Sequence, residues 1–138
     1  MYVAGRMLLA GWKIVYAGDA ACRHSHNYTV GEEFRRYFDV GVFQGREGWI
    51  KASFGGAGGE GLRFVKSELK FVGVGRAYLW PLVAIRTAAK LLGYKLGQKE
   101  SSIPLSWKKK LSMYRGFWSG PYADAHANTS RTGQADAR

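Results

Sequence analysis

The sequence predicts an α/β fragment that is mostly helical, with one helix and two short strands followed by amphipathic helices. Three observations support this fold class. Hydrophobic residues make up 46% of the 138 residues, which favours a folded chain. Apolar residues recur at three- and four-residue spacing over most of the sequence, which is typical of helices. Only two short runs, at 12–16 and 20–24, have strand character.

The predicted strands lie near the N-terminus and follow a short helix. Residues 2–10 carry apolar side chains at helical spacing, and Gly11 is well suited to end that helix. No capping residue precedes it. Residues 12–16 are rich in β-branched and aromatic side chains, so we expect a strand there, and residues 20–24 after the Gly18-Asp19 turn form a second extended segment.

A second helix is expected to begin at Thr29. Thr29 and Glu32 have the spacing of a capping box, in which each side chain bonds the other residue's backbone N–H. The helix should end near Gly45. One side of this helix carries the apolar residues Phe34, Tyr37, Phe38 and Val42. The other side carries mainly the charged residues Glu33, Arg35 and Arg36.

Residues 53–61 contain five glycines, for which two interpretations are open. A phosphate-binding loop is one, but neither a following Gly-Lys-Ser/Thr nor a preceding strand supports it. A hinge or connecting loop is favoured. Helical spacing resumes at 62–72. A further helix is expected to begin at Trp80-Pro81, with its end weakened by Gly93 and Gly97, and a last short helix is expected to begin at Pro104. Residues 119–138 lack periodicity and are expected to be disordered.

Positive charge is concentrated in the later helices. The chain has a net charge of +11, and between Glu60 and Trp118 twelve Lys and Arg stand against three Asp and Glu. A solvated face, docking on an anionic membrane and nucleic-acid binding are all open, the last disfavoured because no nucleic-acid-binding motif accompanies the charge. No apolar run is long enough to span a bilayer. The residues expected to contact a membrane are Trp80, Arg86, Lys90, Trp107, Lys108, Lys109 and Lys110.

The candidate chemical centre is the segment Arg23-His24-Ser25-His26-Asn27-Tyr28-Thr29. If it is extended, His24 and His26 point to the same face and can converge on one ligand. Imidazole is a common metal ligand and proton carrier, although an isolated His-x-His is a weak signal. The segment also precedes a helix N-terminus, which favours anions. Cys22 is the single cysteine, so a disulfide framework is excluded and a reducing compartment fits.

Several motifs in order resemble bacterial family 2 glycosyltransferases, most closely the rhamnosyltransferases that build O-antigen and other surface polysaccharides. The motifs are Met7-Leu8-Leu9-Ala10-Gly11-Trp12-Lys13-Ile14-Val15-Tyr16, Asp19-Ala20, His24-Ser25-His26-Asn27-Tyr28-Thr29, Glu33-Phe34-Arg35-Arg36-Tyr37-Phe38-Asp39-Val40-Gly41, Gly58-Gly59-Glu60-Gly61-Leu62-Arg63-Phe64-Val65-Lys66 and Arg115-Gly116-Phe117-Trp118.

The resemblance implies the end of a GT-A domain, in which a nucleotide sugar donates a hexose or a rhamnose-like deoxyhexose to a lipid-linked or polysaccharide acceptor. It implies that His24 binds a divalent metal, Mg²⁺ or Mn²⁺, and that substrate contacts come from His26, Asn27, Arg35 and Arg36. No residue of this chain takes the role of catalytic base.

The sequence also departs from that family. It has no Asp-x-Asp and no nucleotide-binding half, so the resemblance implies the C-terminal third of an enzyme, inactive alone. The expected parts are the end of the catalytic domain at 1–48, basic helices at 49–118 and a tail at 119–138. We expect a cytoplasmic protein peripheral to the inner membrane, without nucleic acid. The alternative is a small basic non-catalytic protein that binds an anionic membrane or nucleic acid.

Overall fold

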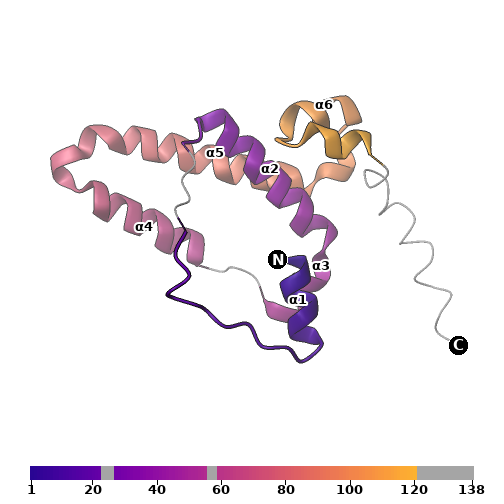
Figure 1. The fold of residues 1–138 in the computed structure, drawn as a ribbon. Helices are drawn as coiled ribbons and strands as arrows, with labels where there is room; N and C mark the ends of the chain where they lie inside the picture. The colour runs from indigo at the N-terminus through magenta and orange to yellow at the C-terminus, as the bar shows by residue number, and fades with distance from the viewer. Residues whose placement is uncertain (23–26, 56–58, 121–138) are drawn as a thin grey trace, which may run out of the picture.

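The structure, a computed structural model, describes residues 1–22, 27–55 and 59–120. Within those ranges it is built from α-helices and short 3₁₀ helices, and it contains no strand (Figure 1). The α-helices are α1 (Tyr2–Leu9), α2 (Val30–Arg46), α3 (Gly48–Phe54), α4 (Glu60–Val72), α5 (Trp80–Gln98) and α6 (Leu105–Leu111). The 3₁₀ helices are η1 (Val74–Leu79), η2 (Glu100–Ser102) and η3 (Arg115–Ser119).

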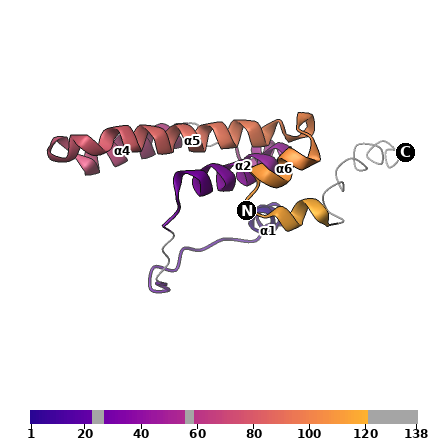
Figure 2. The ribbon, with the colours of Figure 1, turned by 90° about the horizontal axis from the view of Figure 1, so that it is seen from above.

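The centre of the fold is the pair α2 and α5, which lie side by side in Figures 1 and 2. Residues early in α2 contact residues early in α5, and residues later in α2 contact residues later in α5. The two helices therefore run parallel. These contacts are Glu33 with Arg86, Gln44 with Tyr94, and Arg46 with Glu100 just beyond the end of α5. Parallel packing requires a long connection, and α3, α4 and η1 supply it.

The two helices touch through Gly41, Gly93 and Gly97, which we call the glycine seam. A Cβ atom built on Gly97 would lie 2.1 Å from the backbone oxygen of Phe38, and one on Gly93 would lie 2.3 Å from that of Phe34. On the other helix, a Cβ on Gly41 would lie 2.2 Å from the oxygen of Tyr94. No side chain fits these gaps, so the close approach of the backbones depends on glycine.

The core is small and adjoins this helix pair. Phe38, Val42 and Trp118 form a buried cluster, against which Ile103 and Leu111 pack. Most other large apolar side chains of the described residues are exposed, on every α-helix and on the loop before α2. Because so few side chains are buried, helix faces that a compact domain would normally cover are exposed.

Helix α1 is held in place by α3. The Tyr2 and Trp49 rings meet edge to face with centroids 5.7 Å apart, and the Arg6 guanidinium lies 4.6 Å from the Trp49 ring centroid. Gly5 faces the same indole, which leaves no room for a larger residue unless the ring moves. These contacts fix the N-terminal end of α1 beside α2.

The locally encoded helix boundaries are confirmed. Thr29 caps α2, with Thr29 Oγ1 accepting from the Glu32 N–H at 3.3 Å and Glu32 Oε2 accepting from the Thr29 N–H at 2.8 Å. Pro81 lies in the first turn of α5, and Pro104 directly precedes α6. The expected helices at 2–10 and 62–72 correspond to α1 and α4.

Three expectations from the sequence are wrong. Residues 12–16 form no strand, and Val15 and Tyr16 are 82% and 93% exposed, because no described segment pairs with them and an unpaired strand is unstable in water. Of the second expected strand, 20–22 are not in a strand either, and 23–24 lie outside the described residues. Glu33, expected on the outer side of α2, is buried because α5 provides its cationic partners.

Candidate functional site: a groove along α2

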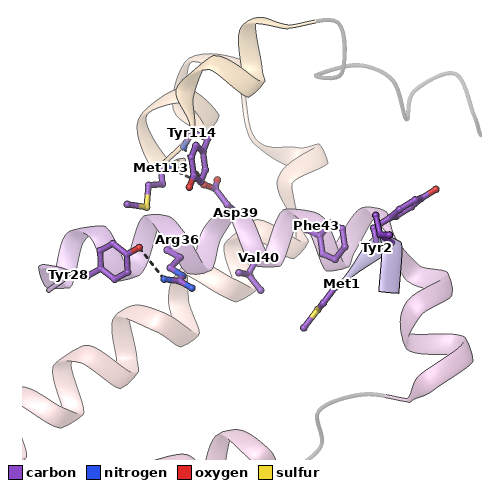
Figure 3. Close-up of a pocket in the computed structure, with 10 residues that line it drawn as sticks. Met1, Tyr2, Tyr28, Arg36, Asp39, Val40, Phe43, Met113 and Tyr114 are labelled. Carbon is purple, nitrogen blue, oxygen red and sulfur yellow. Dashed lines mark hydrogen bonds between the residues drawn. The ribbon is translucent and has the colours of Figure 1, made fainter. Parts of the chain in front are cut away.

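A groove with a cavity volume of about 680 Å³ runs along α2, between the N-terminal end of α1 and the segment that follows α6 (Figure 3). Its lining combines aromatic and aliphatic side chains with one cation and one carboxylate. The lining residues are Met1, Tyr2, Val3, Tyr28, Arg36, Asp39, Val40, Phe43, Met113 and Tyr114. Three separate segments of the chain therefore build it.

The cationic part of the groove is Arg36, which is exposed and is positioned by Tyr28. Arg36 Nη1 donates to the Tyr28 hydroxyl at 3.1 Å, and the guanidinium lies 5.2 Å from the centroid of the same ring. The aromatic ring and the hydroxyl thus hold Arg36 at two points. Its guanidinium has further N–H donors for an anionic or hydroxyl-bearing ligand.

The carboxylate of the groove, Asp39, fixes the segment after α6. Asp39 Oδ2 accepts from the Met113 N–H at 3.0 Å and from the Tyr114 N–H at 3.4 Å. Burial raises the pKa of Asp39, while hydrogen bonds from Ser112, Met113 and Tyr114 act in the opposite direction. Asp39 is therefore a positioning group that holds Tyr114 over the groove.

The composition of the groove suits a carbohydrate-containing ligand. Small-molecule sites are mostly apolar with a few placed polar groups, which describes this lining. Tyrosine rings offer flat apolar faces and hydroxyls, and the Arg36 guanidinium matches the oxygens of a phosphate. The arrangement can hold a ligand and orient it, but within the described residues the groove brings together no nucleophile and base.

The residues expected to bind substrate are only partly brought together. Arg36 lines the groove, whereas Arg35 and Asn27 are exposed beside it without lining it. His24 and His26 lie outside the described residues. Arg36 is thus the one of these five residues that lines the groove, and the expected roles of all five stay predictions.

The described residues do not provide a metal site. Within 1–22, 27–55 and 59–120, no group of three or more His, Cys, Asp or Glu side chains is placed to hold an ion. Mg²⁺ and Mn²⁺ prefer several oxygen ligands, so the described side chains do not fit the expected metal by themselves.

The residues expected to contact a membrane are spread along the molecule and do not share one surface. Arg86 and Lys90 turn toward Glu33, with Nη1 and Nζ at 3.2 and 3.7 Å from its Oε1. Trp80 lies where η1 meets α5. The remaining four residues, Trp107, Lys108, Lys109 and Lys110, belong to α6, where Lys108 pairs with Glu100 and Lys110 lies over the Trp107 ring. No helix in the described part of the chain is both long and apolar enough to cross a bilayer.

Sequence reasoning missed most of the groove. Asp39, Val40 and Phe43 follow Arg36 at spacings of three, four and seven, so they share a stripe of α2 that a helical projection could have singled out. Met113 and Tyr114 carry no such signal, because they are far from α2 in the sequence and only folding brings them next to Asp39.

The chain is similar to rhamnosyltransferases named for the O-antigen chain. It is 52% identical over 118 residues to "O-antigen chain rhamnosyltransferase WbaN" of Salmonella anatum. It is 51% identical over 118 residues to "O-antigen chain rhamnosyltransferase RfbN" of Salmonella typhimurium strain LT2. Each match takes in 86% of this chain but 38% of the relative, so the chain spans well under half of either protein. No family model and no solved structure matches it.

Proposed function

We propose that this chain is the C-terminal part of a family 2 rhamnosyltransferase with a GT-A catalytic domain. The complete enzyme transfers rhamnose, or a similar hexose, from a nucleotide sugar to a lipid-linked or polysaccharide acceptor. The observation that carries the proposal is the identity of 52% over 118 residues with an O-antigen chain rhamnosyltransferase. The many exposed apolar faces support it, because a larger enzyme would cover them.

The groove along α2 is proposed to hold one of the two substrates. Arg36 binds a phosphate or hydroxyl oxygen, and the rings of Tyr28 and Tyr114 pack against a sugar. Asp39 acts indirectly by keeping Tyr114 in position. Orienting a sugar against its reaction partner is a large part of what a transferase must supply.

A divalent metal, Mg²⁺ or Mn²⁺, belongs to the proposal for the complete enzyme, with His24 as one ligand and His26 next to it. When bound, such an ion neutralises charge on a diphosphate leaving group. Because the described residues contain no set of three ligands, the other donors would come from elsewhere in the enzyme, and no step of the present proposal depends on the ion.

The proposed location is the cytoplasmic face of the inner membrane, where a lipid-linked acceptor is reached without crossing the bilayer. The net charge of +11 favours an anionic membrane surface. Taken alone, these 138 residues are proposed to transfer no sugar, since they contain no Asp-x-Asp.

A chimera tests this function. The matching 118 residues of the Salmonella anatum WbaN protein are replaced by those of the present chain, and transfer of rhamnose from its nucleotide to membrane-bound acceptor is measured. We expect transfer within about tenfold of the parent enzyme, a difference of about 1.4 kcal/mol in the barrier. A chimera that accumulates normally but transfers no rhamnose would contradict the proposal and favour a non-catalytic binding protein.

Variants of the chimera test the groove. Arg36→Ala should lower kcat/KM by about tenfold or more, because a charge-assisted hydrogen bond contributes about 1.5–3 kcal/mol. Arg35→Ala, beside the groove, should have a smaller effect. Arg63→Ala is the matched control: Arg63 is exposed on α4 and pairs with Glu60 in the same turn. If kcat/KM falls equally in all three variants, Arg36 does not bind substrate in the groove.

A further inference from the structure

We infer that the turn between α4 and α5 is the part of the molecule that inserts into an anionic bilayer. This inference rests on the proposed peripheral membrane location and assigns it to particular residues. We call the turn the hairpin tip and define it as residues 70–80, comprising the end of α4, Gly73, η1 and the first residue of α5. Figures 1 and 2 both place it at the end of the molecule opposite α6.

Several large apolar side chains at the hairpin tip are strongly exposed. Phe71 and Val74 are each 83% exposed, and Tyr78 is 76% exposed. Trp80, at the base of the tip, is 43% exposed. Apolar side chains that stay in water do not gain the free energy of burial. Because the hairpin tip gathers several of them at one projecting end, that end is suited to insertion into an apolar environment outside the molecule.

The charges around the tip have a single sign. Lys70 and Arg76 are both exposed, and no Asp or Glu occurs between Glu68 and Glu100. Two cations farther along α5, Arg86 and Lys90, are paired with Glu33. The tip therefore presents its own two cations next to its apolar side chains, whereas the cations predicted from the sequence on α5 stabilise the helix pair.

This combination fits a bilayer better than a protein or a nucleic acid. A specific protein interface takes about 800 Å² from each partner, and a turn whose 3₁₀ helix has six residues offers a narrow projection rather than a broad face. A nucleic acid would use the cations but would leave Phe71 and Val74 in water. In an anionic membrane the apolar side chains enter the acyl boundary, Tyr78 and Trp80 lie at the headgroups, and Lys70 and Arg76 contact lipid phosphates.

The test compares two matched pairs of substitutions in the full chain. Binding to vesicles of phosphatidylglycerol and phosphatidylcholine in equal parts is measured by flotation. Val74→Ser with Tyr78→Ser should weaken binding about tenfold. The control is Val15→Ser with Tyr16→Ser, which removes the same residue types at similar exposure from the segment before α2 and should leave binding unchanged. Both pairs are on the surface, and circular dichroism verifies that helicity is retained.

A second measurement reports insertion itself. An environment-sensitive fluorophore is attached at Phe71→Cys or, on α6, at Ser106→Cys, in each case with Cys22→Ser so that one thiol is present. Emission should shift to shorter wavelength on vesicles for the label at 71 and not for the label at 106. Lys70→Glu with Arg76→Glu should weaken binding, and added salt should weaken binding of the unchanged chain.

The outcomes separate this inference from the proposed function. Unchanged binding by the Val74 and Tyr78 pair, or a spectral shift at 106 instead of 71, would overturn the assignment to the tip while leaving membrane docking intact. If the unchanged chain ignores vesicles, or prefers duplex DNA to them, then both the tip assignment and the peripheral location fail. Rhamnosyl transfer by the chimera is measured independently of all these results.

Discussion

Replacing Gly97 with alanine tests the reasoning about the glycine seam. The new Cβ would lie 2.1 Å from the Phe38 oxygen, 2.8 Å from the Val42 nitrogen and 2.9 Å from the Gly41 Cα. All three obstacles are backbone atoms of α2. No side-chain rotation can relieve the clash, so the two helices must move apart along their line of contact.

Two opposing effects set the magnitude. Alanine stabilises a helix by about 1 kcal/mol relative to glycine. Overpacking of a closely packed contact costs about 3 kcal/mol at the upper end of its usual range. The cost at Gly97 should be at this upper end, because the clashing atoms are backbone atoms, which cannot move aside as a side chain can. Separating the helices by about 1 Å also forfeits up to about half of their dispersion attraction. The net expectation is destabilisation by about 2 kcal/mol, or about 30-fold in the equilibrium between closed and open helix pairs.

Hydrogen exchange measured by mass spectrometry is the suitable assay, because it reports on α2 separately from the other helices. Amides of α2 should exchange about 30-fold faster in Gly97→Ala than in the unchanged chain. Gly31→Ala is the control: Gly31 also lies in α2, but its added Cβ meets nothing within 4 Å, so α2 should be unchanged or slightly slower to exchange. Protection in Gly97→Ala equal to or greater than that of the unchanged chain would refute the close approach of α2 and α5.

Three further predictions concern the ends of this assembly. Thr29→Ala should destabilise α2 by about 1 kcal/mol, seen as a lower urea midpoint by circular dichroism, and an unchanged midpoint would deny the cap its role. Asp39→Ala should speed exchange of the Tyr114 amide while leaving α2 protected, whereas loss of protection throughout would indicate general unfolding instead. Burial raises the pKa of Glu100, but its pairs with Lys108 and Arg46 outweigh burial and lower that pKa below 4.5. Its contribution to stability is therefore complete above pH 4.5 and is lost as the pH falls through the lowered pKa. Glu100→Gln should flatten the acid unfolding profile below pH 4.5, and identical profiles would argue against this role.

Features encoded by neighbouring residues could be predicted from the sequence. The capping box joins Thr29 and Glu32 within one turn, and Pro81 restricts its own backbone, so neither depends on the rest of the fold. The spacing also placed Phe38 and Val42 on the buried side of α2, but it placed Tyr37 there too, although that side chain is exposed.

Features that depend on distant partners could not be predicted. The strand expected at 12–16 rested on β-propensity, which has structural meaning only when a neighbouring strand supplies hydrogen bonds. The sequence predicts that Gly93 and Gly97 weaken the end of their helix, yet α5 continues through both to Gln98. Because these residues lack side chains, α2 can pack closely against them. The groove has the same origin, since Asp39 meets Tyr114 only after the chain has folded.

Parallel packing of α2 and α5 has a consequence for the order of folding. The paired residues Glu33 and Arg86 are separated by 53 positions, so bringing them together closes a long loop, which costs about 3.5 kcal/mol of chain entropy before any seam contact forms. Helices such as α4 can form from local contacts in the meantime. During synthesis α2 is made before α5, so its side of the glycine seam has no partner until α5 is complete. Folding of this chain should therefore be limited by the arrival of α5, and lengthening the connection should slow folding more than it reduces stability, since each doubling of loop length costs only about 0.6 kcal/mol.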